Sequence, residues 1–379
     1  MKNKIVHITT VHKRYDSRIF YKECSSLAKA GFEVFLIVAD NFMNEVITLD
    51  RSSAVTIIDV GSFKNRFQRI FGASERVLKI ALEINAQVYH FHDPELLPLA
   101  LKLKKKNKIV VFDSHEDIFA NIKEKAYIPN ILKPIISFLL TLVETYVLKR
   151  IDGVISVTPH ICNKLRKLNK NTVMITNYPI LGERKSENFN RKKSLVFAGG
   201  VMNQWKHEFV LDALALCEDK EVVYNLCGPT YTDYMESLTQ HKSWSRVNYY
   251  GILNKQEVDK LYNESSIGIA TLIYGKNVGG KLGSIGNTKL FEYMAAEIPF
   301  ICTDFVLWKE IVDKYDCGIC VEPTNAEQIA KAIDFLISNP QKRDEMGRNG
   351  RKAVEEVYNW KNQELTLFDF YNKLLTHNK

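Results

Sequence analysis

Short apolar, β-like runs alternate with helical patterns along the whole chain, and this alternation constrains the fold more than any other feature. A polar interval at residues 182–193 separates two such series and reads as a linker. The β-like runs occupy residues 5–9, 33–38, 56–60, 88–91, 109–113 and 153–157 before the interval, and 194–198, 222–227, 246–250, 267–270, 299–302 and 318–322 after it. Strands that alternate with helices favour a parallel sheet covered by helices. We therefore predict an α/β protein of two Rossmann-like, doubly wound parallel-sheet domains facing a central cleft, with ligands at the carboxyl ends of the strands.

The domain boundaries follow from the linker. We place an N-terminal domain at residues 1–182, a C-terminal domain at 183–362, and a final helix at 363–379 that packs back onto the first domain. A length of 379 residues suits two domains of ordinary size. The seven cysteines are scattered, which favours a reducing cytosol, and the first residues read as a buried strand rather than a secretory signal. Cys317 and Cys320 form a C-x-x-C, but no second pair or nearby histidine completes a site, so we predict small buried residues there.

Residues 287–299 say most about function. They follow a loop with several glycines, and their apolar residues recur at helical spacing, so a helix is predicted to start near Asn287, a favoured N-cap residue. The N–H groups at a helix start attract anions. Lys289 and Glu292 lie one turn apart, so a cation and a carboxylate would meet the same ligand. This combination suits a nucleoside diphosphate whose ribose hydroxyls need an acceptor.

Two other nucleotide-binding patterns are disfavoured. Gly275, Gly280 and Lys281 nearly spell a P-loop, but Leu282 stands where Ser or Thr should hold the metal. No G-x-G-x-x-G follows the first β-like run, which argues against a dehydrogenase. The sequence also lacks a convincing D-x-D metal motif.

Charge is spread unevenly along the chain. Residues 1–182 hold 27 Lys and Arg against 17 Asp and Glu, whereas the remainder holds 25 against 27. A basic first half predicts a partner that carries phosphates, and no recognition motif supports a nucleic acid. One basic run, 64–70, brings aromatic residues to one side if it is helical, which would let it rest on anionic lipid. A solvated helix that packs on its own domain is an equal alternative. The most apolar stretch, 131–148, predicts a buried or interfacial helix and no transmembrane segment.

Several short motifs occur in an order typical of one enzyme family. The most specific is Lys289-Leu290-Phe291-Glu292-Tyr293-Met294-Ala295-Ala296, which Pro299 ends. The others are Phe197-Ala198-Gly199-Gly200 with Lys206, Tyr250-Gly251-Ile252-Leu253, Asn359-Trp360, Asp16-Ser17-Arg18-Ile19-Phe20, His90-Phe91-His92-Asp93-Pro94-Glu95 and Asp113-Ser114-His115-Glu116-Asp117. Over nearly its whole length the chain thus resembles retaining glycosyltransferases of the GT-B fold, family 4, in the bacterial branch that makes capsule, O-antigen and exopolysaccharide.

The resemblance implies a donor site in the C-terminal domain. Glu292 would accept hydrogen bonds from the donor ribose, and Lys206 would neutralise the leaving diphosphate. The family's usual arginine six residues before Lys206 is replaced by Gly200, and its usual glutamate eight residues before Glu292 is replaced by Ser284. The implied donor-binding set is Gly199, Gly200, Lys206, Tyr250, Ser284, Asn287, Thr288, Lys289 and Glu292, of which Lys206 and Glu292 are also implied as catalytic.

The resemblance also implies an acceptor side in the N-terminal domain. His115 matches the family's acceptor-side histidine and is the third implied catalytic residue. Other acceptor-side candidates lie at the ends of neighbouring β-like runs: Asp16, Arg18, His92, Asp93, Glu95 and Glu116. Arg18 has a structural alternative, which is an ion pair with a carboxylate such as Glu23.

The implied function is metal-independent hexosyl transfer with retention. The expected donor is a nucleotide sugar, UDP-linked in preference to GDP-linked, and the expected acceptor is a lipid-linked or growing polysaccharide. The protein would be cytoplasmic, with peripheral contact to the inner face of an anionic membrane, and would not bind nucleic acid. Two alternatives stay open: a nucleotide-sugar 2-epimerase of the same architecture, and a non-catalytic nucleotide-sugar binder.

Overall fold

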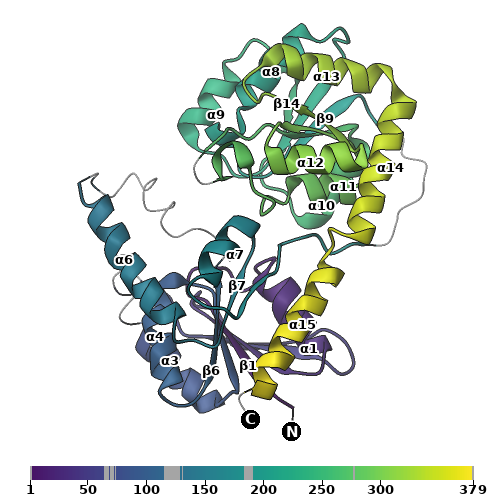
Figure 1. The fold of residues 1–379 in the computed structure, drawn as a ribbon. Coiled ribbons are helices and arrows are strands. Elements are labelled where there is room, and N and C mark those ends of the chain that lie inside the picture. The colour runs from purple at the N-terminus through teal and green to yellow at the C-terminus, as the bar shows by residue number, and fades with distance from the viewer. Residues whose placement is uncertain are drawn as a thin grey trace. The chain divides into compact units, whose positions relative to one another are not determined.

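The computed structural model of the chain describes residues 2–63, 68, 72, 74–114, 129, 131–182, 191–275 and 278–377. The chain divides into two compact units, which can be followed in Figure 1. Unit 1 comprises residues 1–177 together with 360–379, and unit 2 comprises residues 178–359.

Unit 1 is built on a sheet with helices on both faces. Its strands are β1 (Lys4–Ile8), β2 (Glu33–Val38), β3 (Glu45–Thr48), β4 (Ala54–Asp59), β5 (Val88–Phe91), β6 (Ile109–Ser114), β7 (Gly153–Ser156) and β8 (Thr172–Met174). Its helices are the π-helix η1 (Ile19–Cys24), α1 (Ser25–Lys29), α3 (Ser74–Ile84), the 3-10 helix η3 (Pro94–Leu96), α4 (Leu97–Lys104), α6 (Lys133–Leu148), α7 (Pro159–Arg166) and α15 (Trp360–His377). The strand order is β3-β4-β2-β1-β5-β6-β7-β8, and only the β3–β4 pair is antiparallel.

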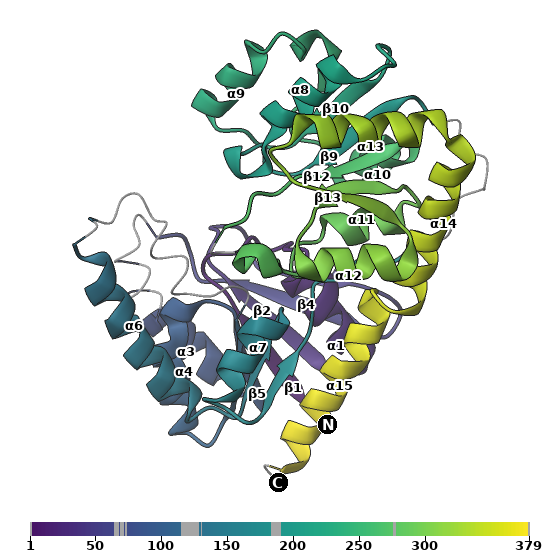
Figure 2. The ribbon, with the colours of Figure 1, turned by 45° about the horizontal axis from the view of Figure 1, so that its top comes forward.

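The core of unit 1 lies on both faces of this sheet, because successive strand residues point to opposite sides. Ile5 belongs to a cluster with residues of η1, α1 and α15, whereas Val6 belongs to a cluster with residues of α3, α4 and α6. Figures 1 and 2 both show α15 beside α1. Trp360 of α15 donates its indole N–H to the hydroxyl of Ser26 in α1 at 2.8 Å, so the end of the chain is anchored in unit 1.

Unit 2 repeats the architecture with a parallel sheet of strand order β11-β10-β9-β12-β13-β14. Its strands are β9 (Ser194–Ala198), β10 (Val223–Cys227), β11 (Val247–Tyr249), β12 (Ile267–Ala270), β13 (Phe300–Thr303) and β14 (Gly318–Val321). Its helices are η4 (Asn203–Trp205), α8 (His207–Leu216), α9 (Thr232–Thr239), η5 (Trp244–Arg246), α10 (Lys255–Glu264), η7 (Gly280–Leu282), α11 (Lys289–Ala295), α12 (Val306–Tyr315), α13 (Ala326–Ser338) and α14 (Pro340–Glu356). A single hydrophobic cluster joins the sheet to these helices.

The predicted α/β class, with two domains built on parallel sheets, is confirmed with local corrections. Every predicted β-like run overlaps a strand, but the sequence analysis missed β3 and β8, which are short and lie at the two edges of the unit 1 sheet. The first helical segment of unit 1 is the π-helix η1, and the side chain of Asp16 accepts the N–H groups of Arg18 and Ile19 at its first turn. For 131–148 the buried alternative is wrong, because most of the apolar residues of α6 are exposed.

Candidate functional site

The centre of the unit 2 sheet provides the first candidate site. From β9 the chain adds strands outward on one side, through β10 to β11, and from β12 it adds them outward on the other, through β13 to β14. In an open parallel sheet a ligand crevice lies at the carboxyl ends of the two strands where the order reverses. The donor-binding residues predicted after β9 (Gly199, Gly200 and Lys206) and after β12 (Ser284 to Glu292) follow these two strands.

The Glu292 carboxylate accepts three side-chain hydrogen bonds at this site. Its Oε1 accepts the hydroxyl of Thr288 at 2.6 Å, and its Oε2 accepts the hydroxyl of Tyr262 at 2.9 Å and the ammonium of Lys289 at 2.6 Å. Burial opposes ionisation, but the Lys289 charge and these three hydrogen bonds lower the pKa of Glu292 to about 2. The side chain stays 31% exposed, so an ionised carboxylate is held in a fixed orientation and can still meet a ligand.

The helix that carries Glu292 starts later than predicted. α11 begins at Lys289, and its N-cap residue is Thr288 rather than Asn287. Asn287 still contributes, because its side-chain oxygen accepts the N–H of Lys289 at 3.1 Å. Since α11 spans only seven residues, its dipole is short, and the ammonium of Lys289 adds a full positive charge at its first residue.

Glycines bring this helix start close to the end of β9. A Cβ on Gly199 would lie 3.1 Å from Cε of Lys289, so the lysine side chain passes directly over that glycine. Gly228, after β10, has a φ of 134°, and a Cβ there would lie 1.8 Å from the carbonyl oxygen of Gly199. Only glycine fits position 228. Neither Gly228 nor Tyr262 was predicted from the sequence, because neither residue lies in one of the predicted motifs.

Lys206 lies on the loop between β9 and α8 and adopts a left-handed backbone conformation, with φ 52°. Its ammonium donates to Asn203 at 2.7 Å and pairs with Glu208 at 3.3 Å. The loop docks on the end of β12, since Thr271 donates its hydroxyl to the carbonyl of Trp205 at 2.8 Å. The structure therefore places Lys206 by the same pair of strand ends as Glu292, with side-chain partners of its own.

The other predicted donor-binding residues have structural contacts. Gly200, after β9, would bring a Cβ within 3.1 Å of the Met202 side chain. Tyr250 follows β11; its hydroxyl lies 3.4 Å from the side-chain oxygen of Asn225, and the residue is 46% exposed. Ser284 accepts the N–H of Gly286 at its hydroxyl and the indole N–H of Trp308 at its carbonyl. Ser284 thus ties the glycine-rich loop to α12.

The corresponding strand ends of unit 1 are closed. The order reverses between β1 and β5, and Asp93, just after β5, accepts hydrogen bonds from the hydroxyls of Thr9 and Thr10 after β1, at 3.1 Å each. Burial raises the pKa of Asp93, although the hydrogen bonds from Thr10 oppose that rise. Asp93 is 1% exposed, so it joins the two strand ends from within.

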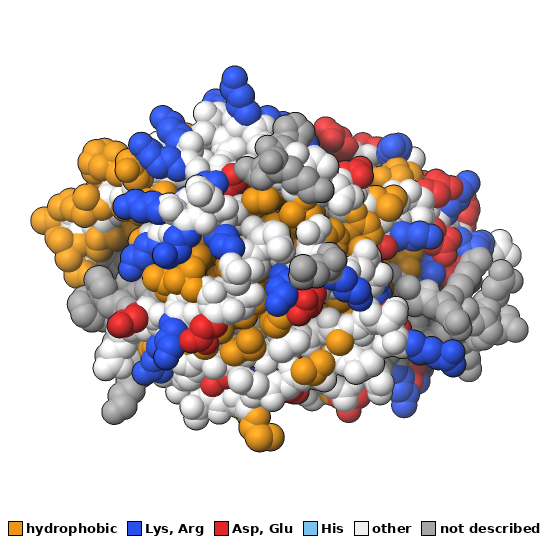
Figure 3. Space-filling view, turned by 90° about the horizontal axis from the view of Figure 1, so that it is seen from below, with side chains coloured by type: hydrophobic (Ala, Val, Ile, Leu, Met, Phe, Trp, Pro, Cys, Tyr) orange, Lys and Arg blue, Asp and Glu red, His pale blue; other side chains and the backbone are white. Residues whose placement is uncertain are grey.

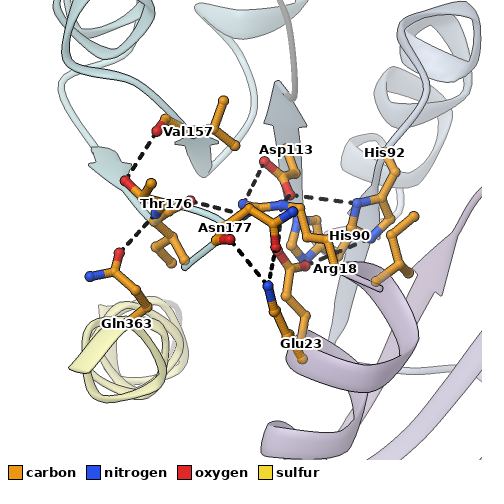
Figure 4. Close-up of polar contacts among 12 residues, drawn as sticks. Arg18, Glu23, His90, His92, Asp113, Val157, Thr176, Asn177 and Gln363 are labelled. Atoms are coloured by element: carbon orange, nitrogen blue, oxygen red, sulfur yellow. Dashed lines mark hydrogen bonds and ion pairs between the residues drawn. The ribbon is translucent and has the colours of Figure 1, made fainter. Parts of the chain in front are cut away.

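Arg18 lies in the same closed region (Figure 4). Its guanidinium forms two hydrogen bonds to Asp113, at 2.8 and 3.1 Å, and its Nε lies 3.0 Å from Glu23. Asp113 and Glu23 are fully buried, and Arg18 is 3% exposed. The pair with Glu23 is the structural alternative predicted for this arginine. The structure does not place Arg18, His92 or Asp93 on an accessible surface.

Three histidines and Glu23 form a buried cluster beneath Asp93. His7, His90 and His92 each bring a ring nitrogen within 3.8 to 3.9 Å of Glu23 Oε2. Burial, and then the neighbouring histidines, lower the pKa of His7 and of His90 well below the usual range, so both rings are neutral.

This cluster is the one set of possible metal ligands that the described part of the chain brings together, within 4.8 Å of one another. Several of its polar atoms have protein contacts, although Nε2 of His7 and Nε2 of His90 have no hydrogen-bond partner among the described residues. His7 Nδ1 lies 3.0 Å from His92 Nε2, His90 Nδ1 lies 2.7 Å from the Tyr371 hydroxyl, and the Arg18 charge adjoins Glu23. The arrangement fits a closed polar network better than a cation site, because a metal would compete with a guanidinium for the same carboxylate.

The remaining acceptor-side residues fall into two groups. Asp16 starts η1 through its contacts with Arg18 and Ile19, and Glu95 is half-buried in η3. His115 and Glu116 lie outside the described residues, as does most of the basic run 64–70.

Each of the two units matches a known protein family. Residues 17–177 match the family described as Glycosyltransferase Family 4, and residues 182–353 match the family described as Glycosyl transferases group 1. Similar solved structures include sucrose-phosphate synthase of Thermosynechococcus elongatus (TM-score 0.74, 16% identity, 99% of this chain and 100% of the other) and a glycosyltransferase of Rickettsia africae (TM-score 0.69, 16% identity, 99% of each chain). Anabaena HepE, solved with UDP-glucose, has a TM-score of 0.67 at 13% identity, over 98% of this chain and 99% of the other.

These matches show that the fold is GT-B. The two family matches then assign the chain to the GT-B glycosyltransferases, with a family 4 domain followed by a group 1 domain. An uncharacterized glycosyltransferase of Methanocaldococcus jannaschii is 26% identical over 178 residues, which are 45% of this chain. The match spans 42% of that relative's length.

Proposed function

We propose that this protein transfers a hexose-type sugar, with retention and without a metal, from a nucleoside diphosphate donor to a lipid-linked or growing polysaccharide. The observation that carries the proposal is the ionised Glu292 carboxylate, fixed by Lys289, Thr288 and Tyr262 beside the glycines that end β9. A carboxylate has about four acceptor sites, and the three hydrogen bonds described leave one at Oε1 for a ribose hydroxyl.

The donor is proposed to be UDP-linked in preference to GDP-linked. Anabaena HepE, which shares the fold, was solved with UDP and with UDP-glucose, and this supports a uridine nucleotide here. The exposed ring of Tyr250, after β11, is available to the base. The product would belong to a cell-surface polysaccharide such as capsule or lipopolysaccharide, as the resemblance to the bacterial branch implies.

The proposed chemistry follows from charge development. The bond between the anomeric carbon and the diphosphate oxygen breaks, which leaves negative charge on the diphosphate and positive character on the sugar. The acceptor hydroxyl oxygen bonds to that carbon on the same face, and its proton passes to the departing phosphate. Lys206 and Lys289 would offset the charge on the leaving group, and losing one such group commonly costs about 3 kcal/mol in the transition state.

The place of the reaction is also part of the proposal. A lipid-linked acceptor is held at a membrane, so we propose a cytoplasmic protein in peripheral contact with an anionic membrane face. Among the residues that the structure describes, no helix combines the length and the apolarity needed to cross a bilayer.

The proposal is tested with purified protein, a panel of UDP and GDP sugars, and polyprenyl-linked acceptors. Glu292→Gln keeps the side-chain shape but removes the charge, and Lys206→Met removes the proposed phosphate contact. The matched control is Lys255→Met, which removes an exposed lysine on α10 that is 81% exposed. We expect loss of transfer in the first two variants and unchanged transfer in the control.

Product analysis separates the alternatives. Turnover of the donor alone into an epimer would show the epimerase, and tight donor binding with no product from any acceptor would show the binder. Wild-type transfer by Glu292→Gln would reject this site as the donor site.

A further inference from the structure

Helix α6 of unit 1 presents an apolar face that the rest of the described structure does not cover. The face consists of Ile135, Phe138, Leu139, Leu142 and Tyr146, and Ile131 lies in the turn just before the helix; each is more than half exposed. Their spacing of three, four and seven residues places them along one side of the helix. Hydrophobic side chains exposed singly are ordinary, but a contiguous face of this size marks a surface that binds something apolar.

The fold holds α6 in place by its other side. Val147 and Leu148 are buried in the core cluster shared with α3 and α4, so the end of the helix is anchored. Figures 1 and 2 show the first half of α6 extending away from the sheet of unit 1. The anchored end and the exposed first half make α6 a projecting element whose apolar face is accessible.

Positive charge lies near the C-terminal end of this face. The only acidic residue within α6, Glu144, is buried, whereas Lys149 and Arg150 follow the helix in exposed positions. The guanidinium of Arg150 stacks on the ring of Tyr146 at 3.6 Å, which places a cation at the edge of the apolar face. The adjacent α4 is followed by exposed Lys105 and Lys106. In Figure 3 hydrophobic side chains gather at the edge where Figure 1 places α6, with Lys and Arg side chains beside them.

We infer that the apolar face of α6 inserts into the surface of an anionic phospholipid membrane. The sixteen residues of α6 span about 24 Å as a helix, and such a helix lies in the plane of the interface rather than across it. The apolar side chains enter the acyl boundary, and the basic residues contact anionic headgroups. A second copy of the chain is the less favoured occupant, because it would bring the same cations toward one another.

This inference rests on the proposed peripheral contact with a membrane, but not on the transfer reaction. The membrane contact is thereby assigned to α6 and not to the basic run 64–70, for which the sequence predicts such a contact. Binding can therefore be measured without donor or acceptor, and a failure of catalysis leaves it unaffected.

The test is flotation of the full-length protein with vesicles of phosphatidylethanolamine and phosphatidylglycerol, and with neutral phosphatidylcholine vesicles. The double variant Phe138→Asp, Leu142→Asp removes the centre of the apolar face. The control is Met43→Asp, which places the same charge at a side chain of unit 1 that is 87% exposed. Because all three side chains are exposed, thermal unfolding should match wild type, which verifies that the variants fold.

We expect wild type and Met43→Asp to float with anionic vesicles. The double variant should bind these vesicles at least about tenfold more weakly than wild type. Raising the salt should weaken wild-type binding, since it screens the headgroup charge. Three results would overturn the inference: no wild-type flotation with anionic vesicles, equal flotation of the double variant, or a wild-type dimer in solution that the double variant converts to monomer.

Discussion

The two units share one order of six parallel strands, β4-β2-β1-β5-β6-β7 in unit 1 and β11-β10-β9-β12-β13-β14 in unit 2, but the charges at their central strand ends differ in exposure. In unit 2, Glu292 and Lys289 are 31% and 12% exposed and lie against glycines. In unit 1, Arg18, Glu23 and Asp113 are sealed, and Asp93 ties the ends of β1 and β5 together. Position at the switch point of a doubly wound sheet therefore does not itself make a ligand site. Glycines and partly exposed charges mark the strand ends of unit 2 as the candidate, whereas the charged groups at those of unit 1 are buried.

The greatest loss of stability is expected from adding a side chain where β9 and β10 end in unit 2. Gly228→Ala would place a Cβ against the Gly199 carbonyl and strain a φ of 134°, so the end of β9 must shift. We expect a loss of unfolding free energy of about 4 kcal/mol or more, together with loss of UDP binding. Gly31→Ala in unit 1 is the matched control, because its φ of 97° brings the strain without any atom within 4 Å. Equal melting temperatures for the two variants would contradict the close approach at Gly228.

The next effect tests the closed network of unit 1. Arg18→Met leaves Glu23 and Asp113 buried without their cation, which should destabilise unit 1 by about 3–5 kcal/mol. Hydrogen exchange by mass spectrometry should show faster exchange in peptides of β1, β5 and β6, with unit 2 unaffected. UDP affinity should stay at the wild-type value at a temperature where the variant is folded. A large loss of UDP affinity without destabilisation would mean that Arg18 serves ligand binding.

A third prediction concerns how the stability of unit 2 depends on pH through one buried histidine. His207 is fully enclosed, with one ring nitrogen bonded to the Tyr224 hydroxyl at 2.9 Å, and burial lowers its pKa from 6.5 to about 3. The unfolded chain therefore takes up a proton near pH 6.5 that the folded chain refuses, so stability falls as the pH falls from about 6.5 toward 3. At pH 5 this single group should cost about 2 kcal/mol relative to pH 7.5. Denaturant unfolding of His207→Gln should lose that part of the pH dependence, and an unchanged profile would count against it.

The smallest effect concerns the hydrogen bonds that orient Glu292. Tyr262→Phe removes one donor to Oε2 but leaves Lys289 and Thr288 in place. We expect a loss of about 1 kcal/mol in stability and a few-fold loss in UDP affinity, measured by calorimetry. Tyr249→Phe, which removes a hydroxyl bonded to the carbonyl of Gly228, is a suitable comparison for tyrosine removal outside the Glu292 group. A greater loss of affinity in Tyr249→Phe than in Tyr262→Phe would contradict the assigned role.

The sequence could predict the architecture because strand and helix periodicities are local signals. β2, β9 and β12 have the predicted bounds, since each is a short apolar run between polar or helical segments. β3 and β8 escaped prediction because edge strands are short and gain much of their stability from tertiary pairing. Gly228 also escaped prediction, because its role depends on the backbone oxygen of Gly199, which lies far away in the sequence.

Burial at the candidate sites could not be predicted. The sequence places Arg18, His92 and Asp93 at strand ends as readily as Lys206 and Glu292, because both groups follow apolar runs. Only the folded chain shows that Arg18 meets Asp113, 95 residues away, and that the ring of His90 meets Tyr371 of α15. The exposed face of α6 was likewise ambiguous, because an apolar helix reads the same whether it is buried or interfacial.

The most direct test of the proposed donor site is hydrogen exchange of the wild-type protein with and without UDP. Slower exchange with UDP is predicted for peptides that cover residues 196–206 and 284–296 of unit 2, with no change over 4–10 and 88–96 of unit 1. Protection confined to the unit 1 peptides, or none over 284–296 at saturating UDP, would contradict the assignment of the donor site to Glu292 and its neighbours.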